Sequence, residues 1–250
     1  MDDNIYKKYC DIIARYIENY IGDNAKDFQL YDRDKIRYYL TTKTIKLSPP
    51  IDQIMDSILK YELNKNPILD ISKLPQQIIL IKHDITQIKC DAIVNAANSK
   101  GLGCFEPDHK CIDNIIHNKA GPNLRLECQT ILKGKEIATS DLIITNGYNL
   151  PCKKIIHVVG PIYDKATHDK CASELLQCYI NCLRSAHNNN WNSIVFCCIS
   201  TGLYGFPAGL AAKIATTTTK KFVKFFSPKM KIIFCTYIDK DYNLYQKLIS

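Results

Sequence analysis

The chain has 250 residues, of which 46% are hydrophobic and 23% are charged, so it can form a sizeable core and lacks the composition of a disordered protein. The acidic start argues against a signal peptide, and the lack of a long apolar run argues against a membrane span. We therefore expect a cytoplasmic protein with no membrane partner. The net charge of +8 lies entirely on residues 76–250, because residues 1–75 carry 12 basic and 12 acidic side chains. This basic excess favours an anionic partner without identifying it.

The N-terminal part of the sequence has helical periodicity. Apolar residues spaced along one face predict a helix over residues 4–22 and a second over residues 33–45. Ser48-Pro49-Pro50 supplies an N-cap and a first-turn proline for a third helix. Asn66-Pro67 interrupts this pattern, and we place a boundary near residue 75, after a helical N-terminal extension.

Beyond the boundary, over residues 76–250, short apolar runs alternate with helical segments. Strands are predicted over residues 77–82, 91–95, 141–145, 154–159, 194–199 and 231–237, and helices over residues 111–119, 122–133, 171–187, 207–226 and from about 241. Continuous apolar strands are typical of a sheet that helices cover on both faces. The sequence therefore predicts a three-layer α/β/α domain with a mixed sheet, whose functional groups lie beyond the carboxyl ends of the strands.

The twelve cysteines are spread from Cys10 to Cys235, and several lie in apolar runs. Without a secretory signal this distribution predicts buried thiols in a reducing compartment rather than disulfides. Two cysteines differ in their setting, because Cys104, His109 and Cys111 fall within eight residues of one predicted loop. Three such ligands suit a tetrahedral zinc with an open fourth position, which is the arrangement of catalytic zinc sites.

Two further loops carry polar groups at strand ends. Asp84 follows the first strand, where its carboxylate could accept a hydrogen bond from a nucleobase amine, although a turn or cap aspartate is the commoner role. Residues 200–207 form a glycine-bearing loop that enters a helix at Pro207. Backbone amides of such a loop, in front of a helix N-terminus, can hold phosphate oxygens.

Four motifs in order resemble the macrodomain family, an ADP-ribose-binding fold. They are Asp84-Ile85-Thr86, DAIVNAAN at residues 91–98, HVVGP at residues 157–161 and STGLYGFP at residues 200–207. The loop of residues 103–113 and the helical extension are similar to the zinc-containing subclass that removes ADP-ribose from proteins. His83 departs from the pattern, because the family usually has glycine before the aspartate.

The resemblance implies a role for each matching residue. Asp84 would hold the adenine amine, with the backbone amide of Ile85 nearby, while Asn95 and Asn98 would face the distal ribose and Asp113 would be the catalytic aspartate. The implied Zn²⁺ ligands are Cys104, His109 and Cys111. The loop that holds the diphosphate is implied to consist of Ser200, Thr201, Gly202, Leu203, Tyr204, Gly205 and Phe206, with Tyr204 or Phe206 against the ribose.

The implied activity is zinc-dependent hydrolysis of mono-ADP-ribose from modified proteins, at Asp or Glu. A module that binds ADP-ribose without cleaving it is one alternative, and a hydrolase of O-acetyl-ADP-ribose or an ADP-ribose phosphate is another. A zinc and nucleic-acid-binding protein is not favoured, because there is no second ligand cluster and no RNA-binding signature. His157 lies in an apolar strand and His117 follows Asp113 on its helix, and both are expected to be structural.

Overall fold

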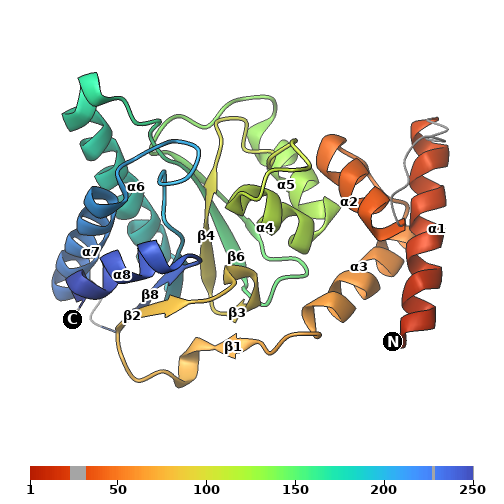
Figure 1. Cartoon of the computed structure of the whole chain (residues 1–250), viewed down its shortest axis with the longest axis horizontal. Helices are drawn as coiled ribbons and strands as arrows, with labels where there is room; N and C mark the ends of the chain where they lie inside the picture. Colours follow the sequence, from red (N-terminus) through yellow and green to blue (C-terminus); the bar gives the residue numbers. More distant parts are fainter. Residues whose placement is uncertain (23–31, 227–228, 250) are drawn as a thin grey trace.

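The structure is a computed structural model that describes residues 1–22, 32–226 and 229–249 (Figure 1). It begins with the helices α1 (Asp3–Ile21), α2 (Asp32–Thr42) and α3 (Pro49–Leu63), which confirm the three predicted helices. The Asp2 carboxylate caps α1 by accepting hydrogen bonds from two backbone N–H groups, and Gly22 ends it with a φ of +69°. Ser48 occupies the N-cap position of α3 but makes no side-chain cap hydrogen bond.

The first three helices enclose a hydrophobic cluster of their own. Its fully buried members come from all three helices and include Ile13, Ile17, Ile36, Met55 and Ile58. α1 contacts α2 and α3, and α2 and α3 in turn contact α4 (Ile112–Ala120). Figure 1 shows α1–α3 at one end of the molecule, beyond α4 and α5 (Pro122–Leu132).

The central sheet has six strands in the order β2-β8-β7-β4-β6-β5. All neighbouring pairs are parallel except β5 and β6, which are antiparallel, so the sheet is mixed as predicted. The bounds of these strands are β2 (Ile78–Lys82), β4 (Ala92–Ala97), β5 (Leu142–Asn146), β6 (Lys154–Val159), β7 (Ser193–Phe196) and β8 (Lys231–Thr236). A second sheet pairs the short strands β1 (Leu69–Asp70) and β3 (Ile88–Lys89), which were not predicted.

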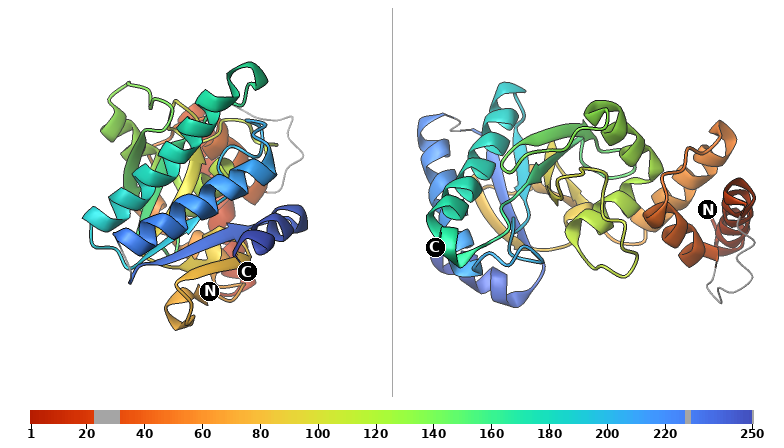
Figure 2. Two further views of the ribbon diagram at one scale, coloured as in Figure 1. Left: turned by 90° about the vertical axis from the view of Figure 1, so that its left-hand side faces the viewer. Right: turned by 90° about the horizontal axis from the view of Figure 1, so that it is seen from above.

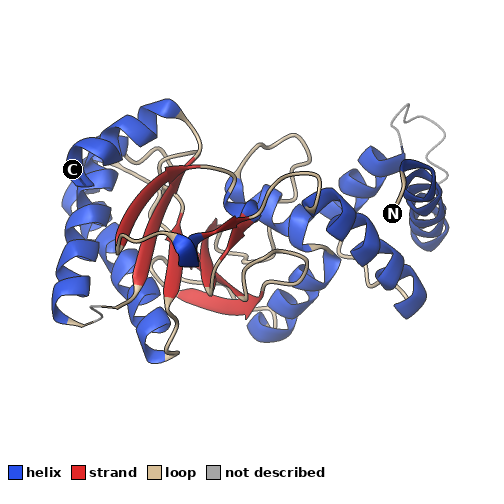
Figure 3. Ribbon diagram, turned by 90° about the horizontal axis from the view of Figure 1, so that it is seen from below, coloured by secondary structure: helices blue, strands red, loops and turns tan. Residues whose placement is uncertain are grey.

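Helices cover both faces of the central sheet, as Figures 2 and 3 show. α4 and α5 contact β4 and β5 on one face, and the other face is covered by α6 (His168–Asn188), α7 (Ala208–Phe225) and α8 (Asp239–Ile249). This arrangement confirms the predicted α/β/α layers. Single 3₁₀ turns, η1 (Ile71–Lys73), η2 (Ile85–Gln87) and η3 (Lys165–Thr167), complete the described structure.

The topology brings three loops to one edge of the sheet. Because β2, β4 and β7 are parallel to their common neighbours, the loops after Lys82, Ala97 and Phe196 leave the sheet at the same edge. All twelve cysteines lie among the described residues and all are free thiols. No helix in the described ranges is long and apolar enough to cross a membrane.

Candidate active site

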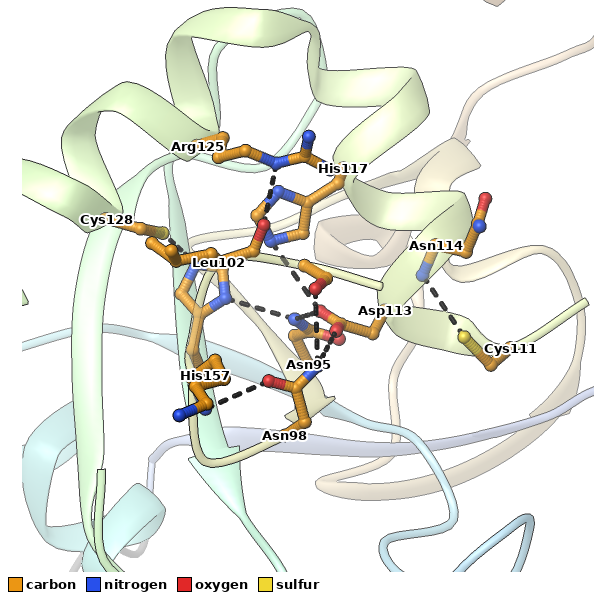
Figure 4. A network of polar contacts seen from close by, with 12 residues as sticks. Asn95, Asn98, Leu102, Cys111, Asp113, Asn114, His117, Arg125, Cys128 and His157 are labelled. Atoms are coloured by element: carbon orange, nitrogen blue, oxygen red, sulfur yellow. Dashed lines mark hydrogen bonds and ion pairs between the residues drawn. The ribbon is translucent and has the colours of Figure 1, made fainter. Parts of the chain in front are cut away.

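The Asp113 carboxylate is held in place by two amide side chains (Figure 4). Asn95 Nδ2 donates to its Oδ1 at 2.7 Å, and Asn98 Nδ2 lies 3.3 Å from its Oδ2. Asp113 lies in the first turn of α4, whose N-cap residue is Cys111. Burial raises the pKa of Asp113 to about 6, although the Asn95 hydrogen bond and the Arg125 charge act in the opposite direction.

Asn95 is held in turn by His157 on the neighbouring strand. The two residues are directly opposite in the parallel pairing of β4 and β6, and Asn95 Nδ2 lies 3.0 Å from His157 Nδ1. Burial lowers the pKa of His157 to about 3, so the imidazole is neutral. Because an amide nitrogen only donates, Nδ1 is the acceptor, and the ring proton on Nε2 is donated to Thr145 Oγ1, 2.9 Å away.

A cavity of about 1090 Å³ opens at the edge of the sheet where the three loops meet. Residues from each loop line it, together with residues of α2 and α4. Its lining includes Asp84 and Ile85, Asn98, the stretch from Gly103 to Asn114, the stretch from Ser200 to Tyr204, and Arg37 and Asn118. The cavity is therefore long enough to bring the Asp84 loop, the Ser200 loop and Asp113 to a single elongated ligand.

The loop after β7, which lines this cavity, carries unpaired backbone donors. Its fold is fixed from within, because Phe206 N–H donates to Ser200 O and Gly205 N–H donates to Gly202 O, each at 3.0 Å. Over the described part of the chain, the N–H groups of Gly202, Leu203 and Tyr204 make no hydrogen bond to protein. Free donors in front of the N-terminus of α7 are suited to phosphate oxygens.

Comparison with known proteins agrees with this geometry. The family model described as Macro domain matches residues 94–215. A protein-ADP-ribose hydrolase of Staphylococcus aureus (strain MSSA476) is 42% identical over 204 residues, which cover 79% of this chain and 76% of the relative. The chain belongs to the macrodomain family. A protein-ADP-ribose hydrolase of Treponema medium is 47% identical over 169 residues, covering 67% of this chain and 65% of that relative.

Solved macrodomains share the fold. A Trypanosoma brucei macrodomain in complex with ADP-ribose superposes with a TM-score of 0.68 at 29% identity, over 86% of this chain and 95% of the other. The Oceanobacillus iheyensis macrodomain with ADP gives a TM-score of 0.61 at 36% identity, over 68% of this chain and 88% of the other.

The loop of residues 103–113 brings some, but not all, of the expected metal ligands close together. Cys104 Sγ lies 3.5 Å from His109 Nδ1, and Cys111 Sγ accepts a hydrogen bond from Asn114 N–H at 3.4 Å. Burial, and after it the neighbouring Cys104 thiol, raise the pKa of Cys111 to about 11. The ligand atoms of the three residues do not all lie within 4.8 Å of one another in this structure.

A second group of side chains could hold a metal ion, behind the first. The ligand atoms of His117, Cys128 and His157 all lie within 4.8 Å of one another, and the three side chains are buried. Neither ring nitrogen of His117 has a hydrogen-bond partner among the described residues, although its Nε2 lies 3.6 Å from Asp113 Oδ1. Sequence reasoning did not find this group, because its members come from α4, α5 and β6.

The structure separates some of the expected ligand-binding residues from the cavity. Asn95 is fully buried and lies beneath Asp113, so it supports the carboxylate instead of lining the cavity. Gly205 and Phe206 do not line it either. Phe206 is 2% exposed and packs against the ring of Tyr163 with centroids 5.2 Å apart, so of the two aromatic residues expected against the ribose Tyr204 alone lines the cavity.

The Asp84 turn is intact although His83 replaces the usual glycine. Asp84 Oδ1 accepts hydrogen bonds from the N–H and the hydroxyl of Thr86, and both Asp84 and Ile85 line the cavity. His83 N–H donates to Thr236 O at 3.1 Å, and Cys235 Sγ lies 3.2 Å from His83 O. The histidine is therefore accommodated against β8, and Asp84 Oδ2 makes no hydrogen bond to the described residues.

Arg125 is a buried cation of the site that sequence reasoning missed. It is 4% exposed, its Nε donates to Leu102 O at 2.7 Å, and its guanidinium lies 4.3 Å from the centre of the Phe105 ring. Burial lowers the pKa of Arg125, and the Asp113 charge raises it. The only signal in the sequence is a single arginine on the predicted helix of residues 122–133.

Proposed function

We propose that this macrodomain is a zinc-dependent hydrolase that releases mono-ADP-ribose from proteins modified on Asp or Glu. Residues 76–250 would form the catalytic unit and residues 1–75 its helical extension. The observation that carries the proposal is the Asp113 carboxylate, which two amides hold at the cavity beside a loop with two thiols and an imidazole. The similarity to protein-ADP-ribose hydrolases supports it.

The cavity residues suit the successive parts of ADP-ribose. Asp84 Oδ2 is available to accept a hydrogen bond from the adenine amine, beside the backbone of Ile85. The free N–H groups of Gly202, Leu203 and Tyr204 would hold the diphosphate, together with Ser200 and Thr201 of the same loop. Asn98 and Asp113 would then contact the distal ribose.

The loop residues fit zinc by their donor chemistry. Cys104, His109 and Cys111 provide two sulfur donors and one nitrogen donor, and Cys104 and His109 already touch. Zinc in such a site supplies Lewis acidity, which polarises an oxygen atom or lowers the pKa of a water molecule. With these three protein ligands, a zinc ion would keep one coordination position for a water molecule or a substrate oxygen.

The protein's own groups orient the reactants. In the proposed reaction a water oxygen bonds to C1 of the distal ribose while the bond from C1 to the protein carboxylate breaks. The carboxylate leaves with the electron pair, and the proton that the water loses passes to the Asp113 carboxylate and from there to solvent. Asp113 would accept a hydrogen bond from the attacking water or a ribose hydroxyl, and its two amide donors keep its oxygens aimed at the cavity. Asn95 and His157 lie behind it and fix its direction.

The test is release of free ADP-ribose from a protein mono-ADP-ribosylated on glutamate, followed by chromatography, with metal analysis of the purified enzyme. We expect release by the wild-type protein, loss of release after treatment with a chelator and recovery with zinc. Binding of ADP-ribose without release would favour a non-catalytic module. Parallel reactions with O-acetyl-ADP-ribose and ADP-ribose phosphate separate the remaining substrates, and chelator-resistant release would contradict the role of zinc.

A further inference from the structure

The end of α2 is joined to the metal-ligand loop through Arg125. The Arg125 Nη1 donates to Leu40 O and Lys43 O, both at 2.8 Å, and the Arg125 Nε donates to Leu102 O in the loop. The last carbonyls of a helix have no partner within the helix, so a buried guanidinium is a strong cap for them. One arginine of the macrodomain thus fixes the end of α2 and the start of the loop together.

Two other connections reach the loop beyond Cys104. Arg37 Nη1 of α2 donates directly to Pro107 O at 2.7 Å. Thr41 of α2 pairs with Asn118, whose Nδ2 donates to Asn114 Oδ1 at 2.6 Å, and Asn114 Nδ2 donates to Glu106 O at 2.8 Å.

We infer that α2 is a positioning element for the candidate metal-binding loop, which it holds at three carbonyls on both sides of Cys104. These carbonyls belong to Leu102, Glu106 and Pro107, and each is bound by a chain of contacts that begins on α2. The metal-related part of this inference rests on the proposed function. The N-terminal extension thereby acts on the site without contacting the reacting atoms.

The reason for such a device lies in the loop itself. Residues 98–111 have no regular secondary structure, the side chain of His109 is exposed and that of Cys104 is half-buried, so local hydrogen bonds alone leave the ligands poorly fixed. Within the loop, the backbone contributes the hydrogen bonds from Gly101 N–H to Asn98 O and from His109 N–H to Glu106 O. A rigid helix that holds the neighbouring carbonyls lowers the entropy that metal binding would otherwise have to remove.

The test uses the full chain with Arg37→Ala and, as its control, Arg15→Ala. Arg15 is an arginine of the same extension, is 74% exposed, and pairs only with Asp11 of its own helix in the described structure. Hydrogen exchange of the loop is measured on metal-free protein, and zinc affinity is measured by competition with a coloured chelator. Loss of one charge-assisted hydrogen bond predicts about tenfold weaker zinc binding.

We expect faster exchange of the His109 amide and weaker zinc binding in Arg37→Ala, partial rescue in Arg37→Lys, and no change in Arg15→Ala. If Arg37→Ala does not fold, Thr41→Val tests the connection that runs from Thr41 through Asn118 and Asn114 to Glu106. This substitution removes a hydroxyl at nearly constant volume. Unchanged loop exchange in Arg37→Ala and Thr41→Val, or equal changes in Arg15→Ala, would overturn the positioning role. Absence of zinc binding by wild-type protein would refute the proposed cofactor, while the exchange comparison still decides the role of α2.

Discussion

Replacing Asn95 with alanine should destabilise the protein and inactivate it together. The amide donates to the Asp113 carboxylate and to His157 Nδ1, and the side chain is fully buried. Loss of a hydrogen bond to a charged acceptor costs about 1.5–3 kcal/mol, and the unpaired His157 nitrogen adds about 1–3 kcal/mol. A total of about 4 kcal/mol lowers Tm by about 8–16 °C in a chain of this size. With Asp113 held by the longer Asn98 contact alone, we expect ADP-ribose release to fall by about 100-fold.

The assay combines thermal unfolding of ligand-free protein with single-turnover release of ADP-ribose. Asn146→Ala is the matched control, because Asn146 is an exposed amide on β5 that pairs with Glu127 and Lys154 at the surface. That variant should unfold within about 2 °C of wild type. If Asn95→Ala shows the same small change and retains turnover, the amide does not hold Asp113 and the reasoning fails.

Two further predictions concern the loop after β7, which is expected to hold the diphosphate, and the ion pair between α2 and α3. A Cβ atom at Gly160 would lie 2.1 Å from Ser200 Oγ, so Gly160→Ala should displace Ser200. We expect ADP-ribose binding, measured by calorimetry, to weaken at least about tenfold. Gly202→Ala should fold normally, because there is open space around a Cβ atom at that position. Burial opposes ionisation of Glu62, but the Arg33 guanidinium at 2.6 Å offsets this and the pKa of Glu62 is lowered. The pair therefore stabilises the fold above the unfolded pKa of Glu62, and this contribution is lost as pH falls through the folded pKa. Tm measured from pH 6 to pH 3 should fall less steeply in Glu62→Gln, and parallel curves would contradict the assignment.

The helices and main strands could be predicted from the sequence because each is specified locally. Helical spacing and the stop at Gly22 located α1, and continuous apolar runs located the buried strands. β1 and β3 have two residues each, too few to show any period, and they exist only because they pair with each other. The third helix was also predicted from Pro49-Pro50, although Ser48 makes no cap bond.

The candidate site was predictable where it is a loop motif and unpredictable where it depends on packing. The strand-end loops carry Asp84 and residues 200–204, and the chain order alone brings them to one edge of the sheet. Tyr204 or Phe206 was expected against the ribose, yet the position of Phe206 in the core depends on contact with Tyr163, 43 residues earlier in the sequence. The contacts of Arg125 with Lys43, just after α2, and with Leu40 of α2 span 82 and 85 residues, and no local pattern records them.

The two groups of metal-ligating side chains differ in what already surrounds them. In the buried group, His157 Nε2 is already hydrogen-bonded to Thr145 and is not free to bind a metal. Burial, His157 and the Arg125 charge lower the pKa of His117, so an added cation there would also be close to a positive charge.

The loop group is less enclosed, because His109 is exposed and Cys104 and Cys111 are half-buried, so a metal there would remain partly hydrated. We therefore expect one zinc per chain by mass spectrometry, lost in Cys104→Ala and kept in Cys128→Ser, with circular dichroism to show that both variants fold. Two zinc ions per chain would place zinc in the buried group as well, and loss of the metal in Cys128→Ser but not in Cys104→Ala would place it there instead.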